Sequence, residues 1–111
     1  MLKILKVYVR KLIKVIKINE SIFEVIVTKD TTTKHKIKLS DKVYQDLCDS
    51  KITEIDLIIK SFEFLLERES NESILREFNL EIIETYFPEY PISIKKKFNW
   101  YPELLSKNSV I

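Results

Sequence analysis

The chain has 111 residues, of which 45% are hydrophobic and 32% are charged, and these values predict one globular domain over residues 1–111. The absence of glycine excludes the glycine-rich phosphate loops of nucleotide-binding proteins. Any turn with a positive φ must therefore use Asn, Asp or another residue. The single cysteine, Cys48, excludes an internal disulfide and predicts a cytoplasmic location. No apolar run approaches the length of a membrane-spanning helix, so we expect no membrane partner.

The net charge of +2 is distributed unevenly along the chain. Residues 1–18 carry six basic and no acidic side chains, residues 19–94 carry nine basic and sixteen acidic ones, and residues 95–111 carry four basic and one acidic. Basic ends of this kind can bind nucleic acid, or they can fold against an acidic body. We favour the second interpretation.

The first third of the chain predicts a small sheet. Residues 1–18 form a basic N-terminal extension or an extra strand, because their apolar spacing fits a helix while their β-branched content favours a strand over residues 12–18. Apolar and polar residues then alternate over residues 22–28 and again over residues 34–39, on either side of a polar turn. This alternation predicts an antiparallel hairpin with one apolar face.

Helical patterns follow the hairpin. We expect four helices, over residues 41–48, 54–69, 71–78 and 80–87. Ser40 or Asp41 can cap the first, Thr53 the second and Asn71 the third, and Pro88 ends the fourth. The third and fourth helices are predicted to bury the apolar residues Ile74, Leu75, Phe78, Ile82, Ile83, Tyr86 and Phe87.

Residues 91–111 form an aromatic and basic C-terminal tail, in which Ile92 and Ile94 indicate an edge strand over residues 91–97. Together these patterns predict an α+β fold. A small antiparallel N-terminal sheet of two to four strands is packed on one face by a C-terminal group of about four helices.

A resemblance rests on several sequence segments. These are FEFLLERE at 62–69, ESIL at 72–75 and YFPEY at 86–90, preceded by a hairpin that ends at Leu39. Over residues 22–90 the chain resembles a family of small uncharacterised bacterial proteins. That resemblance implies no activity and no site residue. Residues 1–18 and the aromatic tail are departures from the family pattern.

The residues able to carry out chemistry are few. His35 is the only histidine, and its place on the apolar face of a predicted strand indicates a packing residue with a backbone partner. Cys48 is the only thiol, so a zinc site would lack ligands, and we expect neither metal nor cofactor. Acidic side chains crowd residues 63–77, where we expect ion pairs on helix surfaces. Arg68 and Arg76 are expected to brace the helix junction through such a network.

Nucleic-acid binding is the alternative function. Residues 72–87 superficially suggest a helix-turn-helix, but the second helix would present Glu81 and Glu84 to phosphate and has no Lys or Arg, so we reject that docking mode. A better candidate surface consists of Lys34, Lys36, Lys38, Lys95, Lys96 and Lys97, joined by Lys14 and Lys17. Alternating lysines on an exposed edge strand can instead protect against aggregation, and we favour that interpretation.

The C-terminal tail offers a second candidate surface, because aromatic residues are enriched at interface hot spots. The candidate partner-binding residues are Phe98, Trp100, Tyr101, Leu104 and Leu105. They can pack on a second subunit, on another protein or on their own domain. The leading hypothesis is therefore a non-enzymatic protein-interaction or oligomerisation module, which we expect to form a homo-oligomer; an enzyme ranks third.

Overall fold

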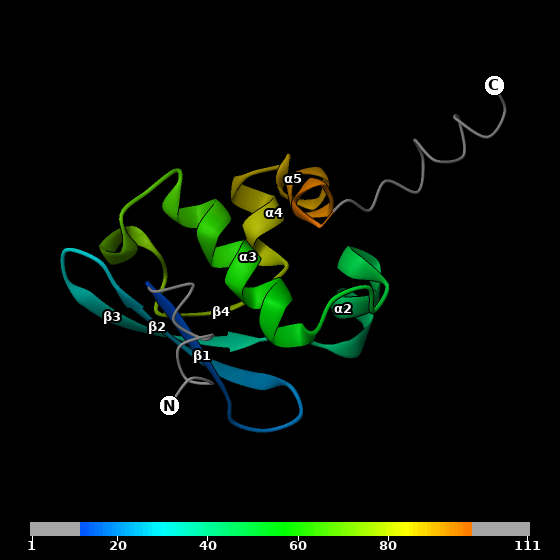
Figure 1. The fold of residues 1–111 in the computed structure, drawn as a ribbon, viewed down its shortest axis with the longest axis horizontal. Helices are drawn as coiled ribbons and strands as arrows, with labels where there is room; N and C mark the ends of the chain where they lie inside the picture. Colours follow the sequence, from blue (N-terminus) through cyan, green and yellow to red (C-terminus); the bar gives the residue numbers. More distant parts are fainter. Residues whose placement is uncertain (1–11, 99–111) are drawn as a thin grey trace, which may run out of the picture.

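The protein is an α+β domain of two layers, a sheet beneath a layer of helices (Figure 1). The computed structural model describes residues 12–98. The strands are β1 (Ile13–Lys17), β2 (Ile22–Thr28), β3 (Thr32–Lys38) and β4 (Glu77–Asn79). The helices are α2 (Asp41–Cys48), α3 (Glu54–Leu66), α4 (Ile82–Tyr86) and α5 (Tyr90–Lys97), with a 3-10 turn, η1, at Asn71–Ser73. The predicted fold class is confirmed.

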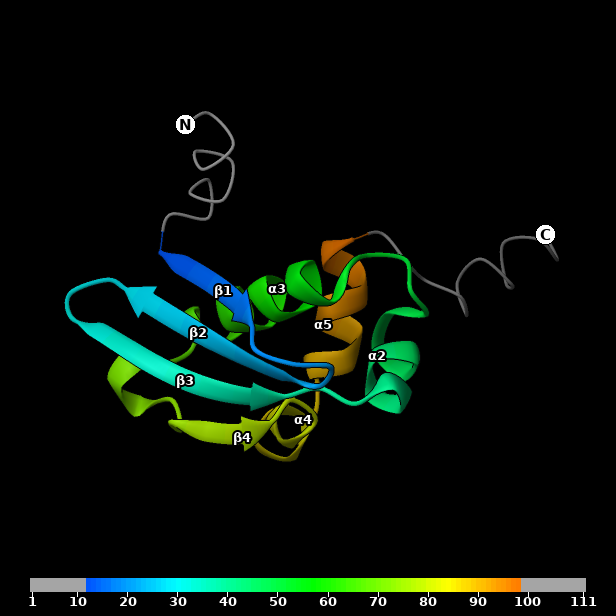
Figure 2. The ribbon, with the colours of Figure 1, turned by 90° about the horizontal axis from the view of Figure 1, so that it is seen from below.

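The four strands lie side by side in the order β1-β2-β3-β4 (Figure 2). The first three form an antiparallel meander, as the alternation predicts. β4 runs parallel to β3, so the sheet is mixed. Of the uncertain N-terminal segment, residues 13–17 form a strand, whereas residues 1–11 lie outside the described part of the chain.

The inner face of the sheet is the predicted apolar face. Phe23, Val25 and Val27 of β2 are fully buried, and their partners on β3 include His35 and Ile37. Helix α3 lies across this face, and Phe62 at its centre has no exposed surface. The Phe62 ring lies 5.3 Å from the His35 ring and 6.1 Å from the Phe78 ring, measured between centroids. Phe62 therefore joins the helix to β3 and β4.

Two helix starts agree with the predicted caps. The Ser40 hydroxyl accepts a bond of 3.2 Å from the Val43 N–H, and the Thr53 hydroxyl accepts one of 3.1 Å from the Asp56 N–H. Between these helices Asp49 has φ 49° and Ser50 φ 58°. A turn that glycine would usually make is thus built by Asp and Ser, as expected for a chain without glycine.

The predicted helix over residues 71–78 is wrong. The segment makes one 3-10 turn and then becomes β4, because the edge of β3 requires hydrogen-bond partners. The Lys36 N–H donates to the Arg76 carbonyl at 2.7 Å, and the Leu80 N–H donates to the Lys38 carbonyl at 3.0 Å. Ile74 and Phe78 are buried as predicted, but Leu75 is 48% exposed.

The predicted edge strand over residues 91–97 is also wrong. These residues belong to α5, where Pro91 stands in the first turn, a position that proline favours. Tyr90 and Ile94, one helical turn apart, are buried, whereas Ile92 is 62% exposed. The preceding helix α4 is shorter than predicted and leaves Tyr86 62% exposed instead of buried.

Arg68 braces the end of α3, as its residue type indicated. Its guanidinium lies 3.6 Å from the Phe64 ring centroid and forms ion pairs with Glu67 at 3.1 Å and Glu89 at 3.3 Å. Lys97 of α5 also pairs with Glu67, at 3.3 Å. The network therefore connects α3 to both ends of α5.

Candidate interaction surfaces

The outer face of the sheet turns away from all the described helices. Figure 2 shows the strands in front and α3 and α5 behind them. Because side chains alternate along a strand, the side chains on this face belong to the residues that alternate with the buried core residues. We call it the open face; its members are Leu12, Lys14, Ile16, Ile18, Ile22, Glu24, Ile26, Thr28, Thr32, Lys34, Lys36, Lys38, Glu77 and Asn79.

Aliphatic side chains gather at the β1 and β2 side of the open face. Leu12 is 38% exposed, Ile16 36% and Ile18 57%, and Ile22 and Ile26 of the neighbouring strand are half-buried. A contiguous group of exposed aliphatic residues of this kind marks interaction sites more often than scattered ones do. A shallow depression of about 550 Å³ lies on the same face, lined in part by Ile18, Ile22 and Lys36.

The charges of the open face are arranged in rows across the strands. One row pairs Ile26 with a lysine on each side, Lys14 and Lys34. The next places Lys36 between Glu24 and Glu77. Four lysines and two glutamates therefore surround the isoleucines, and the face is basic, but its central lysine has an acidic neighbour on each side.

A second surface lies at the other side of the molecule. A groove of about 180 Å³ runs between the end of α3, the segment that includes η1 and β4, and α4. Its lining is mainly apolar and includes the exposed side chains of Leu75 and Tyr86. Residues 69–87, which form most of it, contain one arginine and four glutamates besides Glu77, whose side chain belongs to the open face; of these four, Glu69 lines the groove. We call it the acidic groove.

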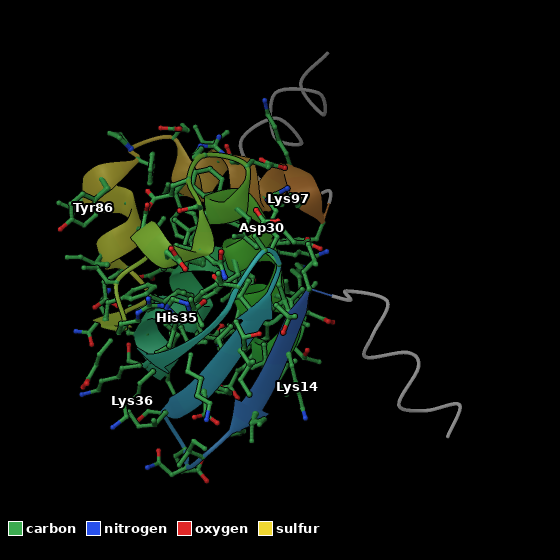
Figure 3. The ribbon with its side chains drawn as sticks, turned by 90° about the vertical axis from the view of Figure 1, so that its left-hand side faces the viewer. Lys14, Asp30, His35, Lys36, Tyr86 and Lys97 are labelled. Carbon is green, nitrogen blue, oxygen red and sulfur yellow. The ribbon has the colours of Figure 1, made fainter. Side chains whose placement is uncertain are left out.

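The two surfaces are separate. Figure 3 shows Lys14 and Lys36 on the lower side of the sheet, and Tyr86 projecting from α4 elsewhere on the surface. The structure also separates the lysines that the sequence grouped together: Lys34, Lys36 and Lys38 lie on the open face, whereas Lys95, Lys96 and Lys97 belong to α5 in the helical layer. β3 is an inner strand of the sheet, which corrects its interpretation as an edge strand.

Of the predicted partner-binding tail, Phe98 alone lies in the described range. It is half-buried and packs against the core of its own domain, one of the arrangements expected for it. Trp100, Tyr101, Leu104 and Leu105 lie outside the described residues.

His35 has the backbone partner that was predicted for it. Its Nδ1 lies 2.7 Å from the Leu75 carbonyl oxygen, which can only accept, so Nδ1 carries the proton. Nε2 then accepts from the Thr33 hydroxyl at 2.8 Å, and that hydroxyl accepts from the Asn71 amide at 3.2 Å. This buried chain ties β3 to the segment that forms the acidic groove.

Acid is expected to destabilise the protein through His35. Burial is the main cause that lowers the pKa of His35 below the usual 6.5, and the charge of Arg76 lowers this pKa further. The hydrogen bond to Leu75 has the opposite effect on the pKa, smaller than that of burial. The unfolded chain therefore binds this proton more readily, so the free energy of unfolding falls as pH falls below about 6.5, by at most about 1.4 kcal/mol per pH unit for one proton. Urea titrations at several pH values between 7.5 and 5 measure how the free energy of unfolding depends on pH. The same pH dependence in the wild type and in His35→Leu would show that His35 is not its cause.

The remaining reactive groups are placed in structural roles. Cys48 is buried, and burial raises the pKa of its thiol, which keeps it protonated. The buried Tyr90 hydroxyl bonds to the Ser61 hydroxyl at 2.6 Å, and burial raises the Tyr90 pKa. Within residues 12–98 there is no group of three or more His, Cys, Asp or Glu side chains able to hold a metal ion. No helix in that range has the length and apolar character needed to cross a membrane.

The sequence identified the lysines of the open face as a candidate surface, but not its exposed isoleucines, and it gave no indication of the acidic groove. A signal for the open face was present, because β2 carries isoleucine at positions 22 and 26, opposite in side-chain direction to the core residues Phe23, Val25 and Val27. A strand that is apolar on both sides indicates that both faces become covered. The acidic groove gave no such signal, since Leu75 and Tyr86 fit helical spacings that predict burial. Comparisons with protein-family models, curated proteins and solved structures gave no significant match.

Proposed function

We propose that this chain is a non-enzymatic oligomerisation module whose interface is the open face of the sheet. The observation that carries the proposal is the group of exposed isoleucines on that face, which no described helix covers. Burying these side chains against another copy would remove apolar surface from water, at about 25 cal/mol per Å². The single cysteine supports a reducing, cytoplasmic environment for such a module.

The composition of the open face favours a protein partner over nucleic acid. Single-stranded nucleic acid is bound by a basic groove together with aromatic rings on which bases stack. The described residues of the open face are aliphatic, charged or small polar and include no aromatic ring. Lys36 lies between Glu24 and Glu77, which weakens its attraction for phosphate. On the described part of the open face, the nucleic-acid alternative therefore has the lysines but no aromatic surface on which bases could stack.

Replacing Ile18 by aspartate tests this function. Ile18 is 57% exposed, so the substitution leaves the core intact, but it places a charge in the proposed interface. We expect the wild type to elute as an oligomer and Ile18→Asp to elute as a single chain, as measured by multi-angle light scattering. Ile92→Asp is the matched control, since Ile92 is 62% exposed on α5, in the helical layer.

The control variant should keep the wild-type mass. An Ile18→Asp protein with the wild-type mass, or a wild type that is a single chain at every concentration, would contradict the proposed function. A wild type that gains mass only when a single-stranded oligonucleotide is added would support the nucleic-acid alternative instead.

A further inference from the structure

We propose that the acidic groove is the second half of the interface, so that the open face of one copy packs on the acidic groove of the next and the chains assemble head to tail. This inference rests on the proposed function and names the partner as a second copy of this chain. Such a contact joins two different surfaces, and it therefore closes into a ring or continues as a filament.

The charges of the two surfaces carry the inference. The open face has four lysines against two glutamates, one of which is Glu77. Apart from Glu77, the segment over residues 69–87 has four glutamates against one arginine, and Glu69 lines the groove itself. Two open faces packed on each other would bring the lysines of β3 in both copies into one interface, where like charges oppose association. The open face against the acidic groove instead pairs excess positive with excess negative charge.

The shapes of the two surfaces also correspond. An apolar cavity of about 150 Å³ holds a molecule of the size of benzene. A groove of about 180 Å³ therefore has room for an isoleucine side chain, and Ile18 is the most exposed aliphatic residue of the open face. Leu75 and Tyr86 would lose their exposed surface in the same contact. The exposed apolar residues of the open face and those of the acidic groove would thereby be buried in one interface.

A complementation experiment tests the head-to-tail arrangement. Ile18→Asp disables the open face and leaves the acidic groove intact, and Tyr86→Lys disables the acidic groove and leaves the open face intact. Tyr86 is 62% exposed, as is the control position Ile92, so Ile92→Lys is its matched control. Leu75→Asp, at a position 48% exposed, serves as a second groove variant if Tyr86→Lys fails to fold.

We expect each single variant alone to have the mass of one chain, whereas an equimolar mixture forms a pair of two chains and grows no further. One intact open face and one intact acidic groove remain in that mixture, which is sufficient for a single contact. A Tyr86→Lys protein that keeps the wild-type mass, or a mixture that stays as single chains, overturns the inference. If Ile18→Asp has the mass of one chain in the same experiment, the proposed function of the open face still holds even when the head-to-tail inference fails. The experiment therefore distinguishes failure of the inference from failure of the proposed function.

Discussion

Phe62→Ala is expected to lower the free energy of unfolding by about 3–5 kcal/mol, the usual cost of removing a buried phenylalanine ring from a packed core. The ring has no exposed surface and lies against the rings of His35 and Phe78. Its loss leaves a cavity where α3, β3 and β4 meet. Urea denaturation at a fixed protein concentration measures the change, since oligomerisation makes the apparent stability depend on concentration.

Ile92→Ala is the control for this measurement. Ile92 is 62% exposed, so its truncation should change the free energy of unfolding by no more than about 0.5 kcal/mol. A loss below about 1 kcal/mol for Phe62→Ala would show that α3 is not packed on the sheet as described.

His35→Leu is expected to lower the free energy of unfolding by about 2–6 kcal/mol, because it leaves two polar groups in or near the core without partners at about 1–3 kcal/mol each. The Leu75 carbonyl loses its donor, and the Thr33 hydroxyl loses its acceptor. Ile92→Ala again serves as the control, because Ile92 is 62% exposed on α5, outside both proposed surfaces. Urea denaturation should show a clear loss for the first variant and almost none for the second; similar losses for both would contradict the role of the buried chain.

The elements that local pattern determines could be predicted from the sequence. The hairpin alternation predicts which residues of β2 and β3 enter the core, and the hydroxyl groups of Ser40 and Thr53 predict the starts of α2 and α3. The absence of glycine predicts that a residue such as Asp49 must adopt a positive φ. In each case the physical cause lies within a few residues along the chain.

The elements that tertiary contacts determine could not be predicted in this way. Residues 71–78 have helical spacing, yet β3 requires a strand partner, and this pairing overrides the local preference. The exposed position of Leu75 follows from the same rearrangement. The candidate surfaces depend on which strands are neighbours and on which face the helices cover, and neither follows from residue spacing alone.

Whether the chain oligomerises is tested by its wild-type mass in solution, measured by multi-angle light scattering at low and high salt, with and without a random single-stranded oligonucleotide. Head-to-tail oligomerisation predicts a mass of several chains at low salt and a lower mass at high salt, because salt screens the charges across the interface; the oligonucleotide should leave the mass unchanged. A single chain under every condition, or a mass that rises only with the oligonucleotide, would contradict head-to-tail oligomerisation.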